Sequence, residues 1–274
     1  MLPQRTTMVK EQNSGIDTHA HVYAAPGAIA PEARYRPAGE GLVEDWLKLQ
    51  DAAGITHGVL VQPSFFGTDN GYLLETLRAH PRRLRATVVV EASIAATTLS
   101  QWDALGVRGI RLNQIGRADH ADYAGSAWRA LFVRLADLAW HVEVHAEGAL
   151  TAALLDVLAQ CPCALVIDHF GRPDARLGLR CPGVQAILKA ADARPVYVKL
   201  SAPYRALGDA GAYARLYLER LGAERLMWGS DWPWPQHEGR HSYTHTRAWL
   251  DDWVADAGAR RAILWDTPAR LFRF

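Results

Sequence analysis

The amino-acid sequence predicts a single α/β domain folded as a (β/α)8 barrel, also called a TIM barrel. Eight short apolar runs rich in β-branched residues recur along the chain, and stretches with the apolar spacing of helices lie between them. The chain has 274 residues, and because a barrel of this kind takes about 250 residues, one domain uses nearly all of it. No linker rich in Pro, Gly or Ser divides the sequence.

The eight apolar runs define the expected strands. They are continuous rather than alternating, as in GVLV, TVVV and VYVKL, which is typical of a parallel sheet covered on both faces. The alternation of such strands with helices at this length favours a closed barrel over a doubly wound open sheet. The expected strands are residues 15–22, 56–62, 84–91, 107–113, 141–147, 164–170, 195–201 and 225–231.

Helices are expected where large apolar residues recur every three or four positions, because that spacing places them on one helical face. The first such stretch, with Leu42, Trp46 and Leu49, follows a turn-rich insert at residues 23–41 that contains three prolines. Barrels place active-site loops after their strands, so the insert is expected to be a lid or substrate loop. The further stretches are Leu73, Leu74 and Leu77; Trp128, Leu131, Leu135 and Leu138; Leu154, Leu155 and Leu158; and Tyr213, Leu216, Tyr217 and Leu221.

Composition and charge exclude several classes of protein. Hydrophobic residues make up 49% of the chain, which is ample for a core, and the net charge of +1 provides no field that would attract nucleic acid or an anionic membrane. Residues 1–14 are polar and are expected to form a flexible tail before a barrel at 15–274. The polar N-terminal stretch lacks the apolar run of a signal peptide, and nowhere do about 18 apolar residues follow each other, as a transmembrane helix requires. With three cysteines, Cys161, Cys163 and Cys181, we expect reduced thiols and a cytoplasmic protein; the sequence does not indicate an oligomeric state.

Histidine and aspartate residues close several of the predicted strands. The first strand ends His19-Ala20-His21, the fifth ends at His145, the sixth at His169 and the eighth at Asp231. Side chains two residues apart on a strand point to the same side, so His19 and His21 are both expected to face the barrel mouth. Barrel enzymes place their chemistry at these C-terminal strand ends. The ordered set therefore predicts one active site, whereas most other histidines lie at strand starts, in loops or on helices.

Seven blocks of sequence carry a resemblance to a known family. They are IDTHAHVY, VQPSFFGTDNGYLL, GVRGIRLN, IDHFGRPDA, VYVKLSAPYR, MWGSDWPWPQHE and DTPARLFRF. In this order they resemble the amidohydrolase superfamily and, within it, the amidohydrolase-2 group of lactonases typified by 2-pyrone-4,6-dicarboxylate lactonase. The resemblance covers nearly the whole chain. The fourth strand ends at Arg111, where binuclear members of the superfamily place a bridging Lys or Glu, so a two-metal site is disfavoured.

Four arginines follow predicted strands at the same end of the barrel: Arg111, Arg117, Arg172 and Arg205. Guanidinium groups bind carboxylates through paired, charge-assisted hydrogen bonds, so the grouping predicts a pocket for a small polyanion. The resemblance implies that these arginines hold the two carboxylates of a pyrone substrate and that Tyr35 and Ser64 occupy further binding positions. Trp232 and Trp234 fit a pocket wall and barrel packing equally well.

Opening a lactone requires a polarised carbonyl, an activated water and stabilisation of the tetrahedral oxyanion, and the His/Asp set supplies all three. Asp231 is the predicted general base, which deprotonates water and then protonates the leaving oxygen. His19, His21 and His169 are expected to donate hydrogen bonds to the carbonyl oxygen. The predicted function is therefore hydrolysis of a carboxylated lactone similar to 2-pyrone-4,6-dicarboxylate.

Catalysis without a cofactor is favoured because the lactonases that the sequence resembles act without a metal. Some of these lactonases carry a tyrosine near the position of His145, so the histidine here is a departure that leaves metal binding open. A single zinc ion bound by His19, His21, His145 and Asp231 stays open, since three nitrogens and one oxygen suffice for a mononuclear site that also holds water. Three alternative functions also stay open: a sugar-acid lactonase or lactone isomerase, a mononuclear zinc-dependent decarboxylase, and a non-catalytic barrel that binds an organic acid.

Overall fold

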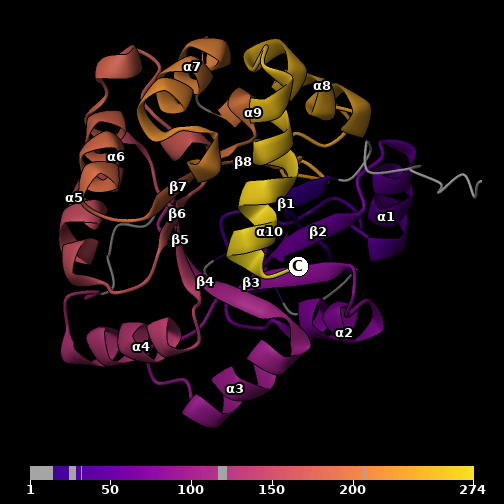
Figure 1. The fold of residues 1–274 in the computed structure, drawn as a ribbon. Coiled ribbons are helices and arrows are strands. Elements are labelled where there is room, and N and C mark those ends of the chain that lie inside the picture. Colours follow the sequence, from indigo (N-terminus) through magenta and orange to yellow (C-terminus); the bar gives the residue numbers. More distant parts are fainter. Residues whose placement is uncertain (1–14, 25–28, 32, 117–121, 206–207) are drawn as a thin grey trace, which may run out of the picture.

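The chain folds into one parallel barrel, as the sequence predicts. The computed structural model describes residues 15–24, 29–31, 33–116, 122–205 and 208–274. Eight strands follow each other around the sheet in the order β1 to β8, and a parallel bridge between Ala20 and Trp232 joins the first strand to the segment after the last. The helices surround the strands (Figure 1). The expected tail at 1–14 and the expected ligand Arg117 lie outside the described residues.

All eight apolar runs form strands, and most of the strands are shorter than the runs. The bounds are β1 Ile16–Ala20, β2 His57–Val61, β3 Leu84–Val88, β4 Val107–Asn113, β5 His141–His145, β6 Leu165–Ile167, β7 Val196–Leu200 and β8 Leu226–Trp228. The last two residues of the predicted sixth strand, His169 and Phe170, and the last of the eighth, Asp231, have φ values of 50°, 57° and 58°. This left-handed backbone conformation cannot continue a strand. Two of the predicted catalytic residues therefore sit on turns immediately beyond their strands.

Helices pack around the outside of the barrel. Each stretch with helical apolar spacing overlaps a helix, and the described chain contains further helices between the other strands and at its C-terminal end. The bounds are α1 Val43–Ala52, α2 Gly71–Ala79, α3 Ala96–Leu105, α4 Ser126–Asp137, α5 Gly148–Val157, α6 Pro182–Ala193, α7 Ala210–Leu221, α8 Tyr243–Trp253, α9 Ala257–Arg261 and α10 Thr267–Phe272. None of the helices in the described ranges has the length and apolar character needed to cross a membrane.

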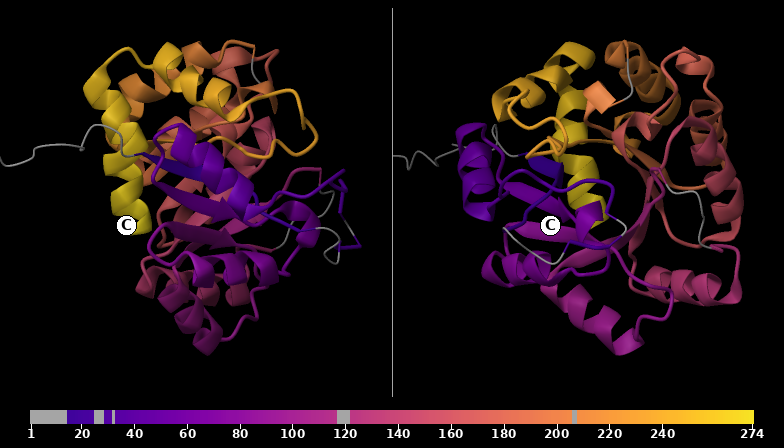
Figure 2. Two further views of the ribbon diagram at one scale, coloured as in Figure 1. Left: turned by 90° about the vertical axis from the view of Figure 1, so that its right-hand side faces the viewer. Right: turned by 180° about the vertical axis from the view of Figure 1, so that it is seen from behind.

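The two ends of the barrel have different characters. At the end where the strands begin, Ile16, Val59, Val166 and Met227 pack against Phe272 of α10, which runs across the barrel in Figure 1. The loops that follow the strands, including the insert after β1, lie at the opposite end (Figure 2). The insert is tied at its base by two hydrogen bonds between the backbones of Tyr23 and Gly41. Access to the polar strand ends is therefore from the loop side.

A buried aspartate connects β1 to the loop after β8. The Asp17 carboxylate accepts hydrogen bonds from Ser230 N (2.9 Å) and Oγ (2.6 Å), from Trp46 Nε1 (3.0 Å) and from the Tyr243 hydroxyl (2.9 Å). Trp46 reaches this position because Gly58 of β2 leaves room for its ring: a Cβ at Gly58 would lie 2.2 Å from Trp46 Cη2. This network fixes the backbone immediately before Asp231.

Candidate active site

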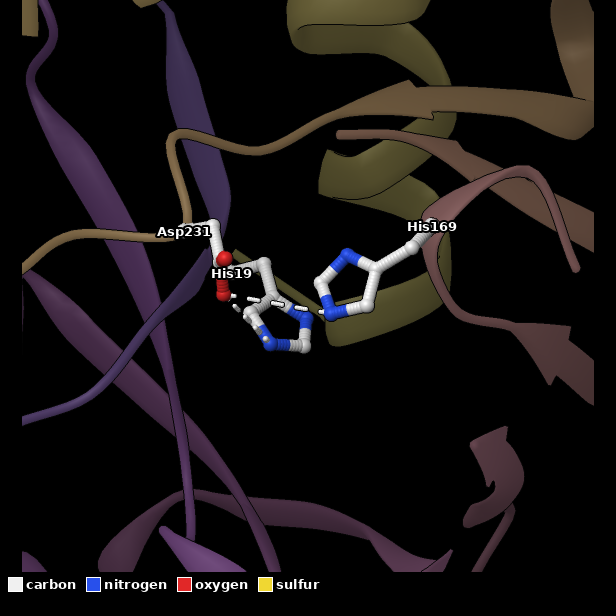
Figure 3. A group of neighbouring side chains, drawn as sticks. All are labelled: His19, His169 and Asp231. Carbon is white, nitrogen blue, oxygen red and sulfur yellow. Dashed lines mark ion pairs between the residues drawn. The ribbon is translucent and has the colours of Figure 1, made fainter. Parts of the chain in front are cut away.

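Three imidazoles surround one oxygen of Asp231. The Oδ1 atom lies 3.5 Å from Nε2 of His21, 3.7 Å from Nε2 of His19 and 3.8 Å from Nε2 of His169. Figure 3 shows His19 and His169 next to this carboxylate, with an ion-pair line from each ring to Asp231. All four residues are buried. The structure thus brings together the four residues that the sequence predicts to be catalytic, although they are far apart in the chain.

The other oxygen of Asp231 is bound by protein groups. Oδ2 accepts hydrogen bonds from the Tyr204 hydroxyl at 2.5 Å and from Nε of Arg205 at 2.8 Å, and Nη2 of Arg205 lies 2.7 Å away. Burial by itself raises the pKa of Asp231, but Arg205 and the neighbouring imidazoles outweigh burial and hold that pKa well below 3.8. The carboxylate is therefore ionised at neutral pH and able to accept a proton.

Hydrogen bonds on the far side of each imidazole orient the rings. Nδ1 of His21 lies 2.8 Å from the carbonyl oxygen of Val61, which can only accept, so Nδ1 carries a proton. Nδ1 of His169 lies 2.8 Å from Oγ of Ser201. Burial lowers the pKa of His169 well below 6.5, so that this ring is neutral.

A layer of charged residues inside the barrel supports the site from below. Lys199 Nζ donates to the Glu143 carboxylate and lies 3.2 Å from Nδ1 of His19 and 3.5 Å from Oδ1 of Asp168. Burial, together with the positive charge of Lys199, lowers the pKa of His19 to about 3. Nε of Arg111 donates to Oδ2 of Asp168 at 2.9 Å and lies 3.3 Å from the Glu143 carboxylate. These ion pairs join the predicted binding residue Arg111 to the predicted catalytic residue His19.

A pocket opens above this layer at the loop end of the barrel. Its volume is about 500 Å³, including the space open to solvent. The predicted site residues that line it are His21, Tyr35, Ser64, Arg111, His145, His169, Arg172, Arg205 and Asp231. His19 does not line it and is fully buried beneath. Trp232 and Trp234 do not line it either; both are buried, and Trp234 Nε1 donates to the Ser230 carbonyl at 3.1 Å, so these tryptophans belong to the barrel packing.

The arginines around the pocket already have acidic or carbonyl partners. Besides its ion pair with Asp231, Arg205 donates from Nη2 to the carbonyl of Pro235 at 3.1 Å. Arg172 donates from Nη2 to Glu147 at 2.9 Å, while its Nε is buried and has no hydrogen-bond partner among the described residues. Arg172 therefore has an N–H group left for a bound anion. Nη2 of Arg111 also has no hydrogen bond to a described residue, although it lies 2.8 Å from Oδ2 of Asp168.

Sequence reasoning missed several residues of the site. Glu143 and Lys199 are charged residues within the apolar runs HVEVH and VYVKL, and this interruption is the signal that marks them. Tyr204 immediately precedes Arg205, which the sequence predicts to be a binding residue. Arg34 of the insert lines the pocket and carries no sequence signal that separates it from surface arginines. Glu143 and Lys199 lie within their strands, so a search for polar residues at strand ends does not find them.

Some of these residues fit a divalent metal ion. Ligand atoms of His19, His169 and Asp231 lie within 4.8 Å of one another, as do those of His19, Glu143 and Asp168. In the described part of the chain, His19 Nε2 and Asp231 Oδ1 are buried without a hydrogen-bond partner, which is expected of atoms that share a cation. His21 and His145, both expected as ligands, belong to neither group; Nδ1 of His145 lies 3.1 Å from Oδ1 of Asn113.

Comparisons with known proteins agree with this architecture. A 4-sulfomuconolactone hydrolase of Rhizobium radiobacter is 30% identical over 93% of this chain and 89% of its own. A crystal structure from Pseudomonas putida, assigned as a 2-pyrone-4,6-dicarboxylic acid hydrolase, is 40% identical, covers 95% of this chain and 98% of its own, and has a TM-score of 0.87. A similar assignment from Acinetobacter baumannii, with citric acid bound, is 33% identical, covers 95% and 99%, and has a TM-score of 0.90.

The family relationship extends over the whole barrel. The sequence profile of the amidohydrolase family Amidohydro_2 matches residues 16–274, which span every strand from β1 to β8 and all of the described site. The resemblance expected from the seven sequence blocks is confirmed. The chain belongs to the Amidohydro_2 amidohydrolase family.

Proposed function

We propose that this chain hydrolyses a lactone that carries carboxylate groups, similar to 2-pyrone-4,6-dicarboxylate. The observation that carries the proposal is the Asp231 carboxylate, which lines the pocket and whose Oδ1 has no hydrogen bond from any described residue, while four guanidinium groups, those of Arg34, Arg111, Arg172 and Arg205, line the same pocket. Relatives named as lactone hydrolases and a related structure with bound citric acid, a tricarboxylate, support it.

Substrate binding is assigned to the arginine side of the pocket. Arg172 offers its unpartnered Nε–H group to one carboxylate, and Arg111 and Arg205 contribute positive charge from beside it. Tyr35 and Ser64 line the same pocket and are proposed as hydrogen-bonding partners. Arg117 remains a proposed ligand by the family resemblance alone. A lactone held in this way presents its carbonyl carbon to the Asp231 side.

The proposed reaction uses Asp231 as the base. Oδ1 takes a proton from water, the water oxygen forms a bond to the lactone carbonyl carbon, and a tetrahedral oxyanion results. When this intermediate collapses, the ring C–O bond breaks and Asp231 returns the proton to the leaving oxygen. Water is thereby added across one bond, and the product carries one more carboxylate than the substrate.

The three imidazoles have two proposed roles, stabilising the oxyanion and holding the water. Lys199 donates to Nδ1 of His19 and the Ser201 hydroxyl donates to Nδ1 of His169 in our assignment, so that both rings carry an Nε2–H group on the Asp231 side, where the oxyanion is proposed to form. His169 lines the pocket and is assigned to donate to the oxyanion, and His19 supports it from beneath the pocket. His21 carries its proton on Nδ1, which leaves a lone pair on Nε2. That lone pair suits an acceptor of the second water proton, so we assign His21 to hold the water rather than to polarise the carbonyl.

The same residues are able to hold a divalent ion. His19, His169 and Asp231 would be its protein ligands, with His21 adjacent. When bound, such an ion acidifies a coordinated water and polarises a carbonyl. A neutral His19 with its lone pair on Nε2, and its Nδ1–H directed to Asp168, is the tautomer that this binding requires. We favour hydrolysis without a cofactor, with a single zinc ion as the alternative.

The test is turnover of defined lactones by enzyme of measured metal content. Purified protein is assayed with 2-pyrone-4,6-dicarboxylate and with a neutral sugar lactone, before and after treatment with a chelator. We expect ring opening of the dicarboxylate, seen as loss of pyrone absorbance, and little turnover of the neutral lactone. Hydrolysis of neutral lactones alone would replace the proposal with a sugar-lactone function. Loss of activity on chelation, restored by zinc, would establish the metal-dependent alternative.

A further inference from the structure

The Tyr204 hydroxyl belongs to no role assigned so far. Tyr204 lies in the short turn Pro203–Arg205 after β7, and its hydroxyl donates to Oδ2 of Asp231 at 2.5 Å. Tyr204 does not line the pocket. Its contact with the reaction is therefore through Asp231 alone.

Asp231 accepts an uneven set of hydrogen bonds. Tyr204 and Arg205 both bind Oδ2, and Nε and Nη2 of Arg205 both approach this one atom, at 2.8 and 2.7 Å. A guanidinium facing a carboxylate ordinarily places one N–H on each oxygen. Here the fork does not reach Oδ1, which has no hydrogen-bond partner among the described residues. The unpaired oxygen is the one that faces the three imidazoles.

The surroundings hold Tyr204 and Arg205 in this arrangement. The Tyr204 ring stacks on the ring of His241, with centroids 4.2 Å apart and planes inclined by 23°, and its centroid is 4.7 Å from that of His237. Arg205 is held from the other side by the carbonyl of Pro235. Burial and the charge of Asp231 raise the pKa of Tyr204, so its hydroxyl keeps its proton and acts as a donor.

We propose that Tyr204 is a positioning residue that holds the Asp231 carboxylate in one rotation, in which Arg205 engages Oδ2 only and Oδ1 stays available to water. The inference rests on the proposed function in so far as Asp231 is the base there. Without the hydroxyl, the carboxylate is free to turn and form the ordinary two-oxygen pair with Arg205. Oδ1 would then be occupied by a guanidinium N–H, and fewer molecules would be ready to react.

The test removes the hydroxyl and keeps the ring. Tyr204→Phe retains the stacking on His241, and we expect kcat to fall by about 10- to 100-fold, as for a misplacement of a catalytic group, with KM changed by less than about twofold because Tyr204 does not touch the substrate pocket. Tyr217→Phe is the matched control. It removes a buried hydroxyl that donates to the Phe170 carbonyl at 3.0 Å and has no contact with Asp231.

A double-mutant cycle separates positioning from general loosening. In an Asp231→Asn background, Tyr204→Phe should have little further effect on kcat, since both changes act through one group. Equal losses of kcat in Tyr204→Phe and Tyr217→Phe, or a loss expressed in KM, would overturn the inference. So would an undiminished effect of Tyr204→Phe in the Asn background.

Crystal structures of the two proteins provide a readout that does not depend on lactone turnover. In the wild type, Arg205 should bind Oδ2 alone, and in Tyr204→Phe it should bind both oxygens. If the wild type opens no lactone and yet the carboxylate turns as expected, the proposed function fails and the positioning inference stands. If the carboxylate keeps its rotation in Tyr204→Phe, the inference fails whatever the substrate.

Discussion

Asp231 accepts hydrogen bonds on Oδ2 and has no hydrogen-bond partner on Oδ1 among the described residues, and this asymmetry explains why a fully buried carboxylate is suited to act as a base. Its negative charge is stabilised by Arg205, which holds the pKa well below 3.8, so a catalytic proton must be taken from water that is itself polarised nearby. His21, which is assigned to hold the water and whose Nε2 lies 3.5 Å from Oδ1, is the group placed to do this. Because Asp231 is only weakly basic, its catalytic effect depends more on its position in the site than on its pKa.

Asp231→Asn removes the proton acceptor and keeps the shape. We expect kcat to fall by something on the order of 10³ or more, because an amide oxygen cannot take the proton from water. The change also leaves Arg205 without its counter-charge, so stability should fall by about 3–5 kcal/mol, the usual result of breaking a buried pair. Steady-state kinetics and urea denaturation measure the two effects. An Asn variant that retains wild-type kcat would remove Asp231 from the mechanism.

Arg172→Met tests carboxylate binding with little disturbance of the fold. The side chain of Arg172 is 15% exposed and its partner Glu147 is 55% exposed, so losing this ion pair should change stability by less than about 1 kcal/mol. Losing the contact to a desolvated substrate carboxylate should weaken kcat/KM by about 30-fold to several thousand-fold, corresponding to about 2–5 kcal/mol. A neutral lactone, if turned over, serves as the control substrate and should be nearly indifferent. An equal loss with both substrates would contradict the assignment.

Arg111→Met should behave differently, because Arg111 lies between two carboxylates that are completely buried. Among the described residues, its removal leaves Lys199 as the one cationic side chain that pairs with both Asp168 and Glu143. We expect a loss of stability of about 3–5 kcal/mol, visible in thermal unfolding before any substrate is added. A normal unfolding temperature together with a large rise in KM would show instead that Arg111 acts mainly on the substrate.

At the scale of elements, the sequence predicts the strands well and the chemistry within them less well. His19 and Asp231 can be predicted as site residues because each is a polar residue at the end of an apolar run. In a barrel the C-terminal ends of all strands meet at one mouth, so such residues are expected to lie together there. The contact between Glu143 on β5 and Lys199 on β7 depends on the strand order of the sheet, in which both strands pair with β6, and no local pattern encodes that order. Helix α3 was not singled out because it buries only Leu99 among its ten residues. Few residues of α3 face the core, so apolar periodicity gives little signal in that helix.

Gly58→Ala tests whether the hydrogen-bond network of Asp17, which fixes the backbone before Asp231, depends on close packing between α1 and β2. The added Cβ would lie 2.2 Å from Trp46 Cη2 and 2.6 Å from Gln50 Nε2, so the indole must move away from Asp17. We expect a loss of stability of about 1–3 kcal/mol, typical of overpacking, and a lower kcat. Gly39→Ala is the matched control, since a Cβ there meets no atom within 4 Å. Equal stability of the two variants would contradict this account.

At the scale of the whole molecule, the barrel encloses an unusual amount of charge. Asp17, Glu143, Asp168, Lys199 and Asp231 are each no more than 1% exposed, and their ion pairs and hydrogen bonds join the interior to the active site. Neutral histidines fill the space between these charges. The stability of the fold therefore depends on the protonation states of these buried groups. Protonation of the histidines in acid should lower the free energy of unfolding.

The free energy of unfolding should fall steeply as the solution is acidified below about pH 6.5. Burial lowers the pKa of His19 to about 3, that of His141 below 6.5, and those of His145 and His169 well below 6.5, whereas in the unfolded chain each titrates near 6.5. Between these values the unfolded chain binds protons that the native protein excludes, so acid favours unfolding by up to about 1.4 kcal/mol per pH unit for each histidine. The carboxylates of Asp168 and Asp231, whose pKa values are also lowered, add to this effect only below about pH 4.

Urea denaturation at half-unit steps from pH 8 to 5 should show a plateau in the free energy of unfolding above pH 7 and a slope of several kcal/mol per pH unit near pH 5. His141→Gln, which removes one such histidine outside the pocket, should make that slope shallower by about 1.4 kcal/mol per unit or less; a stability that is constant between pH 7 and 5 would mean that these imidazoles are not kept neutral by the fold.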